Sequence, residues 1–225
     1  MVDQDLLVFL QSFLTDHRRA IFEEVLAQRT RHFTVVLEDI YLKHNTSAVV
    51  RSCDVFGIQD LHIIENKYSS YVSNQVSKGS HKWIDFHEYN SIANNTKNCL
   101  ETLRADGYQI IATTPGANAC LLEEFDISKK SAFVFGVEKD GISDYIMKEA
   151  DGYLKIPMVG FTESLNVSVA AAIILQSLTH RLKHSSIAWQ LSNQEKDVLR
   201  LKWTKKTINS VDKIIERYYT DKMTQ

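Results

Sequence analysis

The feature of this sequence that most constrains its fold is a series of short apolar segments, rich in β-branched residues, that alternates with helical patterns. The apolar segments are FTVVLE (33–38), LHIIE (61–65), YQIIAT (108–113), SAFVFG (131–136) and YLKIP (153–157). The helical patterns between them cover about 45–56, 89–105 and 142–150. Strands separated by helices in this way form βαβ units. The sequence therefore predicts an α/β fold, a parallel sheet covered by helices on both faces.

Helical patterns also flank this alternating region. Apolar residues recur at helical spacing over 4–30, and 193–219 has the pattern of a basic amphipathic helix. A further, mostly apolar helix is expected over 167–182. We therefore divide the chain into an N-terminal helical arm (1–30), an α/β domain (31–184) and a C-terminal helical arm (185–225).

Charge and cysteine content narrow the class of protein. The net charge is −2, but residues 180–225 carry ten basic and five acidic residues. This local excess fits contact with a polyanion, and equally fits a solvated helix face. No apolar run approaches 18 residues, and the first residues, MVDQDLLVFLQSF, do not resemble a secretory signal. Three scattered cysteines and eight histidines show no metal-binding spacing. We expect a cytoplasmic protein without metal or membrane association.

Three segments at predicted strand ends contain residues suited to ligand binding. In the first, LKHNTSAVVRSCDVFGIQDLHII (42–64), Asn45 is a candidate helix N-cap. Arg51 lies nearly two turns further along this helix. Taken alone, it reads more readily as a surface ion-pair partner, for example of Asp54, than as a functional residue.

The second and third segments are a glycine-bracketed turn and a loop before a long helix. In FVFGVEKDGIS (133–143), Gly136 and Gly141 let a ligand approach the backbone, and Ser143 is a candidate helix cap. The P-loop pattern is incomplete, because no Lys-Ser/Thr follows the second glycine. In IPMVGFTESLNVSVAAAIIL (156–175), Asn166 is a candidate cap of an Ala-rich helix, whose start suits either close packing or an adenine ring.

Together, HNTSAVVRSCDVFG, FGVEKDGIS and IPMVGFTESLNVSVAAA resemble the three ordered motifs of the SpoU (TrmH-type) family of RNA ribose 2′-O-methyltransferases, within the SPOUT superfamily. GSHKW (79–83) is similar to the family's Gly-x-x-Lys-Trp stretch, and the resemblance runs from about Arg29 to Leu182. It implies a trefoil knot in the C-terminal half of the sheet domain, a homodimer, and S-adenosylmethionine bound by the knot loops.

The resemblance also implies roles for individual residues. The implied cofactor-binding residues are Thr113, Gly136, Ile156 and Leu165. The implied catalytic residues are Asn45, Arg51, Glu138, Ser164 and Asn166. In the family proposal the arginine acts as a base, but a guanidinium has a pKa above about 12. A milder hypothesis is that Arg51 grips a phosphate and steadies the developing oxyanion.

The implied substrate is RNA, and similarity to the TrmH subgroup favours the D-loop guanosine at position 18 of tRNA. Two stretches depart from the subgroup: ATTPGANA (112–119) has an unusual loop start, and FTES (161–164) stands where Met-Val-Gln-Ser is frequent. Alternatives are an rRNA ribose methyltransferase, a non-catalytic RNA-binding module, and a generic nucleotide-binding or packing-only domain. The basic residues expected to contact RNA phosphates are Arg18, Arg19, Arg29, Arg31, Lys196, Arg200, Lys205 and Lys206.

Overall fold

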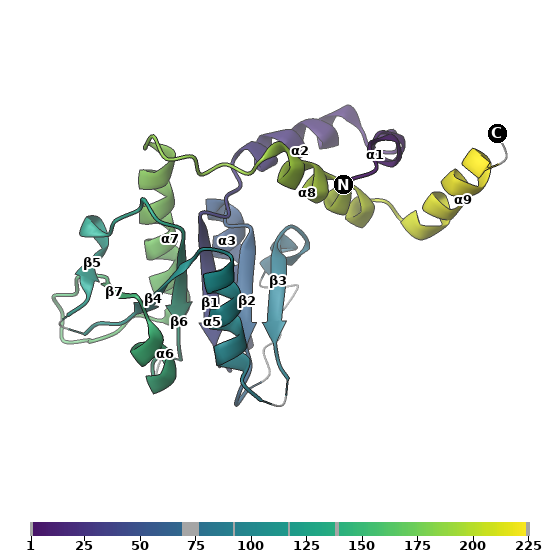
Figure 1. Ribbon diagram of the computed structural model, residues 1–225. Helices are drawn as coiled ribbons and strands as arrows, with labels where there is room; N and C mark the ends of the chain where they lie inside the picture. The colour runs from purple at the N-terminus through teal and green to yellow at the C-terminus, as the bar shows by residue number, and fades with distance from the viewer. Residues whose placement is uncertain (1, 69–76, 92, 117, 138–139, 224–225) are drawn as a thin grey trace. The chain divides into compact units, whose positions relative to one another are not determined.

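The structure is a computed structural model that describes residues 2–68, 77–91, 93–116, 118–137 and 140–223 (Figure 1). Two compact units make up the chain. The sheet unit is Thr30–Trp189, and the helical unit combines Met1–Arg29 with Gln190–Gln225. Within the described ranges, no helix is both long and apolar enough to span a bilayer.

A parallel sheet forms the centre of the sheet unit. Its described strands lie in the order β3-β2-β1-β6-β4-β7-β5, and every neighbouring pair is parallel. This arrangement confirms the predicted α/β fold. The five predicted strands are present, whereas β3 and β5 are additional to the prediction. The strands are β1 (Phe33–Glu38), β2 (Asp60–Ile64), β3 (Asp85–Tyr89), β4 (Gln109–Thr113), β5 (Cys120–Leu121), β6 (Ser131–Phe135) and β7 (Gly152–Lys155).

Helices cover both faces of this sheet, as predicted (Figure 1). The alternation of side chains along a strand divides the core in two. Val35 and Leu37 of β1 belong to the core on the α3 and α7 face, whereas Val36 belongs to the core under α5 and α6. The covering helices are α3 (Lys43–Phe56), α5 (Asn95–Ala105), α6 (Asp144–Glu149) and α7 (Val167–Lys183), with short 3-10 turns at η1 (Ser80–Lys82) and η2 (Leu122–Glu124).

The starts of these helices test the predicted caps. The Ser143 side chain accepts a hydrogen bond from the Ile146 N–H and caps α6. Asn166 likewise caps α7. The prediction for Asn45 is wrong, because α3 begins at Lys43 and Asn45 lies inside its first turn, where its side chain has another partner. The helix predicted from residue 89 starts only at Asn95, since the preceding segment pairs as β3.

The helical unit consists of α1 (Gln4–Gln11), α2 (Asp16–Ala27), α8 (Asn193–Thr207) and α9 (Val211–Met223). The single helices predicted over 4–30 and 193–219 are each broken. Thr15 caps the start of α2, and Ser210 takes a left-handed φ of 53° before α9. Phe22 of α2 and Trp203 of α8 meet edge to face in the core of this unit, with ring centroids 5.7 Å apart. In contrast, α9 contains no buried residue.

Candidate active site

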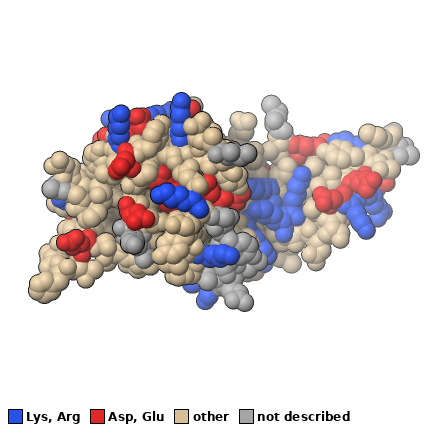
Figure 2. Space-filling view, turned by 90° about the horizontal axis from the view of Figure 1, so that it is seen from below, with Lys and Arg blue, Asp and Glu red and all other residues tan. Residues whose placement is uncertain are grey.

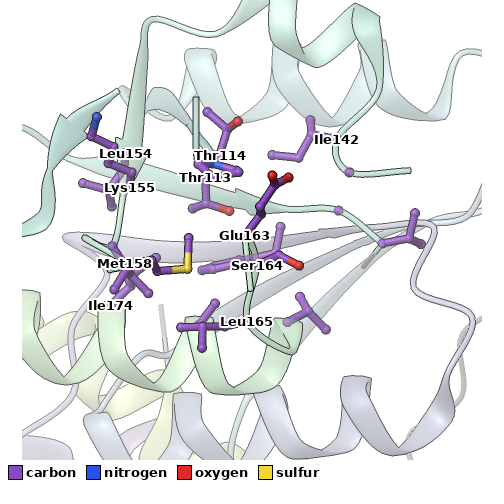
Figure 3. A pocket seen from close by; sticks show the side chains of 18 of the residues that line it. Thr113, Thr114, Ile142, Leu154, Lys155, Met158, Glu163, Ser164, Leu165 and Ile174 are labelled. Atoms are coloured by element: carbon purple, nitrogen blue, oxygen red, sulfur yellow. The ribbon is translucent and has the colours of Figure 1, made fainter. Parts of the chain in front are cut away.

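A cavity of about 460 Å³ opens at the carboxyl ends of β4, β6 and β7 (Figure 3). This edge is where ligands bind in open α/β sheets, and the volume lies within the usual range of about 300–1,000 Å³ for small-ligand sites. The loop between β7 and α7 and the first turns of α7 complete its wall. All four residues predicted to bind the cofactor line it, together with Ser164; they are Thr113, Gly136, Ile156 and Leu165.

The turn after β6 forms one side of the cavity and depends on its two glycines. Val137 and Gly141 exchange backbone hydrogen bonds of 3.1 and 2.8 Å, and Gly141 has a φ of 71° that side chains rarely adopt. A Cβ atom at Gly136 would lie 2.1 Å from the Gly141 carbonyl oxygen. The turn therefore folds directly back over the strand end, which only a glycine at position 136 permits.

Glu38, the last residue of β1, holds the next part of this loop and was not predicted to be a site residue. Its carboxylate accepts hydrogen bonds from the Ser143 N–H at 2.9 Å, the Ser143 Oγ at 2.8 Å and the Thr96 Oγ1 at 3.2 Å. Only 3% of Glu38 is exposed. A buried carboxylate with three donors joins the start of α6 to β1 and α5. The sequence signal was a glutamate ending an otherwise apolar strand.

Asn45 and Asn166 join the first and third sequence motifs. The Nδ2 of Asn166 donates to the Oδ1 of buried Asn45 at 3.1 Å. The Oδ1 of Asn166 accepts from both the N–H and the Oγ of Ser168, at 2.9 and 2.6 Å. One amide therefore caps α7 and links it to α3, so these two predicted catalytic residues lie together.

Arg51 lies elsewhere on the same helix. It is exposed and is not among the residues that line the cavity. Among the described residues its side chain has no ion pair, so the alternative interpretation as a partner of Asp54 is not realised. The remaining predicted catalytic residue, Glu138, lies outside the described residues. One chain thus brings Ser164 to the cavity and pairs Asn45 with Asn166, but it does not bring Arg51 to the cavity.

Of the basic residues in the helical unit, several are engaged within that unit. Arg200 forms a two-pronged ion pair with Glu23, with N–O distances of 2.6 and 2.7 Å, and also contacts Asp197. Arg19 pairs with Asp16. Arg29 is only 1% exposed, and its guanidinium lies over the Trp203 ring at 5.5 Å.

Arg31 belongs to the sheet unit and to a charged network at the β2–β3 edge. Its guanidinium bridges Asp60 and Asp85 at 2.7 and 2.8 Å. Burial acts to raise the pKa of Asp60, but the hydrogen bond from His87 and the charge of Arg31 outweigh it and lower that pKa below its ordinary value. Arg29 and Arg31 thus have buried or paired intramolecular contacts, and their predicted contacts with RNA phosphates stay predictions.

The lining of the cavity indicates the kind of ligand it accepts. Apolar side chains such as Leu154 and Leu165 alternate with the hydroxyls of Thr113, Thr114 and Ser164. Apolar walls with a few hydroxyl and backbone groups suit a nucleoside-like molecule. Within the described ranges, no group of three or more His, Cys, Asp or Glu residues is placed to hold a metal ion.

The fold and the cavity together define an α/β protein with a cavity of small-ligand size at the carboxyl edge of its sheet. Comparison with known proteins identifies the family: residues 32–176 match the model of the SpoU rRNA Methylase family. A tRNA (guanosine(18)-2′-O)-methyltransferase of Borreliella burgdorferi is 41% identical over 201 residues, which cover 89% of this chain and 90% of the relative. This chain belongs to the SpoU rRNA methylase family.

Solved structures agree with this assignment. The A. aeolicus TrmH/SpoU tRNA modifying enzyme superposes with a TM-score of 0.75 at 30% identity, covering 87% of this chain and 98% of that one. AviRb, a SpoU methyltransferase of Streptomyces viridochromogenes, in complex with the cofactor AdoMet, gives a TM-score of 0.58 at 21% identity and covers 71% of this chain and 61% of that one. The second likeness is one of fold alone.

Proposed function

We propose that this protein methylates the ribose 2′-hydroxyl of a tRNA guanosine, at position 18 of the D-loop, using S-adenosylmethionine. The observation that carries this proposal is the 41% identity to a tRNA (guanosine(18)-2′-O)-methyltransferase along 90% of that relative. The similarity covers both the sheet unit and most of the arms, so it extends beyond the catalytic fold that many RNA methyltransferases share.

The cavity fits S-adenosylmethionine in size and chemistry. Leu154, Ile156 and Leu165 offer apolar contacts for an adenine ring, and Thr113 and Gly136 place hydroxyl and backbone groups at the strand ends. The bound cofactor supplies an electrophilic methyl group on a positively charged sulfur. The part played by the protein is to orient that group and to exclude water from it.

In this proposal Arg51 stabilises charge rather than accepting a proton. A guanidinium stays protonated at any physiological pH. Its planar fork suits an RNA phosphate next to the target ribose, and its charge stabilises the oxygen that becomes negative as the hydroxyl loses its proton. The proton leaves to the phosphate or to water. The exposed position of Arg51 leaves the side chain accessible to RNA.

Asn45, Asn166 and Glu38 are positioning residues in this scheme. The Asn166–Asn45 hydrogen bond fixes the start of α7 against α3, and thus fixes the loop that carries Ser164. Glu38 fixes the start of α6, next to the turn that contains Gly141. The proposal gives Glu138 an anchoring role in the same loop.

We include a homodimer and a trefoil knot in the proposal. The proposal of a knot rests on family membership alone. Knots are rare in proteins, and the general rules of topology argue against one. The dimer is supported by exposed apolar side chains on the β7–α7 loop and on α7: Val159 and Phe161 are fully exposed, and Val169 is 46% exposed. Large exposed apolar residues of this kind mark association surfaces. A symmetric partner can also supply the Arg51 that the cavity of a single chain lacks.

Phosphate contacts are assigned in this proposal to four basic residues of the helical unit. Arg18 and Lys206 are exposed, and Lys196 and Lys205 are half-buried. The face in Figure 2 carries acidic as well as basic groups, so charge alone does not define one RNA-binding surface. Each phosphate contact adds affinity that does not depend on RNA sequence and that weakens with salt. We place this activity in the cytoplasm, where tRNA is modified.

The test is to incubate the purified protein with methyl-labelled S-adenosylmethionine and either unmodified tRNA or rRNA fragments. Label in 2′-O-methylguanosine of the D-loop is the expected result, and nuclease mapping locates it. A tRNA whose D-loop guanosine is replaced by a 2′-deoxynucleotide is the matched control and should take up no label there.

The second candidate is rRNA ribose methylation, which the name of the SpoU rRNA Methylase family favours. Label on rRNA but not on tRNA would replace the first proposal by this one. Cofactor binding without label on either RNA would support a non-catalytic RNA-binding module.

A further inference from the structure

Two carboxylates line the cavity without a cationic partner among the residues that the structure describes. Glu163 and Asp140 belong to its wall, and neither forms an ion pair or a side-chain hydrogen bond with another described residue. Lys155 is the one basic residue among the described lining residues, and it is already engaged in another contact. In Figure 3 the Glu163 side chain projects into the cavity, with its carboxylate toward the side where Thr114 and Ile142 are labelled.

Glu163 places a negative charge in the loop between β7 and α7. The packing of the loop does not require a negative charge at position 163, since Glu163 is exposed, lines the cavity and forms no ion pair with another described residue. The charge is therefore available to act on whatever occupies the cavity.

We infer that Glu163 makes the cavity select the cationic cofactor over the neutral product of the reaction. This inference rests on the proposed function. Methyl transfer moves the methyl group from the sulfonium to the ribose oxygen, which loses its proton to phosphate or water. The sulfonium thereby becomes the neutral thioether of S-adenosylhomocysteine, and the rest of the molecule is unchanged. Apolar walls contact both molecules alike, whereas a carboxylate attracts only the positive sulfur.

The size of the cavity sets the size of the effect. A sphere of 460 Å³ is about 10 Å across, so a charge held anywhere inside lies within about one Debye length of the Glu163 carboxylate. At this separation and in partly aqueous surroundings, one charge pair changes affinity by about three- to tenfold. Binding of the thioether should be nearly indifferent to the same charge. The product then leaves more readily than a purely apolar site would allow.

The experiment compares the binding of S-adenosylmethionine and S-adenosylhomocysteine to the wild type and to Glu163→Gln by isothermal titration calorimetry. We expect the variant to bind S-adenosylmethionine about three- to tenfold more weakly, and S-adenosylhomocysteine within about twofold of the wild type. The preference of the wild type should shrink as salt is raised, and the variant, which keeps only Asp140 of the two carboxylates, should show a weaker salt dependence. Glu101→Gln, which removes an exposed carboxylate from α5 outside the cavity wall, is the matched control and should change neither affinity.

Two other results would overturn the inference. Equal weakening of both ligands would mean that Glu163 shapes the loop, and unchanged affinity for both would mean that its charge is screened. In either of these two cases, the proposed function still holds if the wild type binds both S-adenosylmethionine and S-adenosylhomocysteine. A wild type that binds neither ligand would overturn the proposed function and this inference together.

Discussion

The sheet unit and the helical unit are stabilised in different ways. In the sheet unit, every residue of β1, β2 and β6 is buried, and two separate apolar cores lie on the two faces of the sheet. In the helical unit, α1, α2 and α8 each bury one stripe of residues, and α9 buries none. The first unit is a rigid framework with loops at one edge, and the second is a set of amphipathic helices with solvated faces.

This difference indicates how the proposed activity is divided. The cavity described above is lined by the sheet unit alone, because parallel strands end together and leave their loops around one space. The helical unit presents charged side chains at helix surfaces, where they add affinity without forming a shaped site. Changes in the sheet unit should alter cofactor binding and chemistry, and changes in the helical unit should alter RNA affinity alone.

The largest expected effect is that of Arg51→Ala in the sheet unit. Removal of a charge that stabilises a developing oxyanion lowers the rate constant by about 10²–10³-fold. Affinity for S-adenosylmethionine should stay within about twofold of the wild type, because the proposed role of Arg51 is to contact the RNA phosphate and the reacting ribose oxygen, not the cofactor. Single-turnover methylation and calorimetry measure the two quantities.

Arg18→Ala is the matched control, since it removes an exposed arginine from the helical unit. It should weaken RNA binding and leave the single-turnover rate at saturating RNA unchanged. Loss of cofactor binding in Arg51→Ala would contradict the catalytic assignment and the proposed division between the units.

Gly136→Ala should have the next largest effect. The new Cβ would lie 2.1, 2.3 and 2.6 Å from backbone atoms of Gly141 and Ile142, so the whole turn must move. We expect a loss of unfolding free energy of about 1–3 kcal/mol and a loss of cofactor affinity of at least about tenfold, seen by denaturant titration and calorimetry. Gly160→Ala is the control, because its nearest new contact, at 3.9 Å, is an ordinary one. Equal behaviour of the two variants would show that the turn is not tightly closed.

The sequence predicts the sheet unit better than the helical unit, and the reason is burial. FTVVLE and SAFVFG are continuous apolar runs and form β1 and β6 as predicted. The edge strand β3, Asp85–Tyr89, escapes prediction because it is half-buried and carries charged residues. In the helical unit, the apolar periodicity continues through the breaks at Thr15 and Ser210. The left-handed backbone conformation of Ser210 cannot be detected from the spacing of apolar residues.

The candidate site was predictable only in part. Gly136 and Thr113 end apolar runs, so their position at the ligand edge follows from the sheet. The pairing of Asn45 with Asn166 joins residues 121 positions apart and depends on how α3 meets α7. The role of Glu38 likewise depends on a partner, Ser143, that is 105 positions away. Contacts of this range are set by topology, which local patterns do not encode.

Acid should destabilise the sheet unit through His62. Burial lowers the pKa of His62 to about 4, and the charge of His87 acts in the same direction, while the carboxylate of Asp60 opposes this shift. The rings of His62 and His87 are stacked with centroids 4.4 Å apart, and the phenol oxygen of Tyr89 lies 3.2 Å from the Nδ1 of His62. Between pH 6.5 and about 4 the unfolded chain binds the proton and the folded chain does not. As the pH is lowered through this window, the free energy of unfolding should therefore decrease by about 2–3 kcal/mol.

Denaturant titrations across this pH window measure the slope, and His62→Phe should reduce it. A smaller dependence of unfolding free energy on pH, of the same sign, should remain in this variant because of His32. Burial also lowers the pKa of His32, and its hydrogen bond to the Ile127 carbonyl partly offsets this shift. An unchanged slope in His62→Phe would assign the acid sensitivity to other groups.

The smallest expected effect is on RNA affinity, and it tests the contribution of the helical unit. Lys196→Ala with Lys205→Ala removes two charges of α8 that have no ion pair among the described residues. Because phosphate contacts release counterions, tRNA affinity should fall about tenfold at low salt, and the slope of log affinity against log salt should decrease by about 1–2. Cofactor affinity should not change. Lys97→Ala on α5 of the sheet unit removes a similar exposed charge and should leave the salt slope as it is. If Lys97→Ala lowers the slope as much as the double variant, RNA contacts extend over both units and the proposed division between them is wrong.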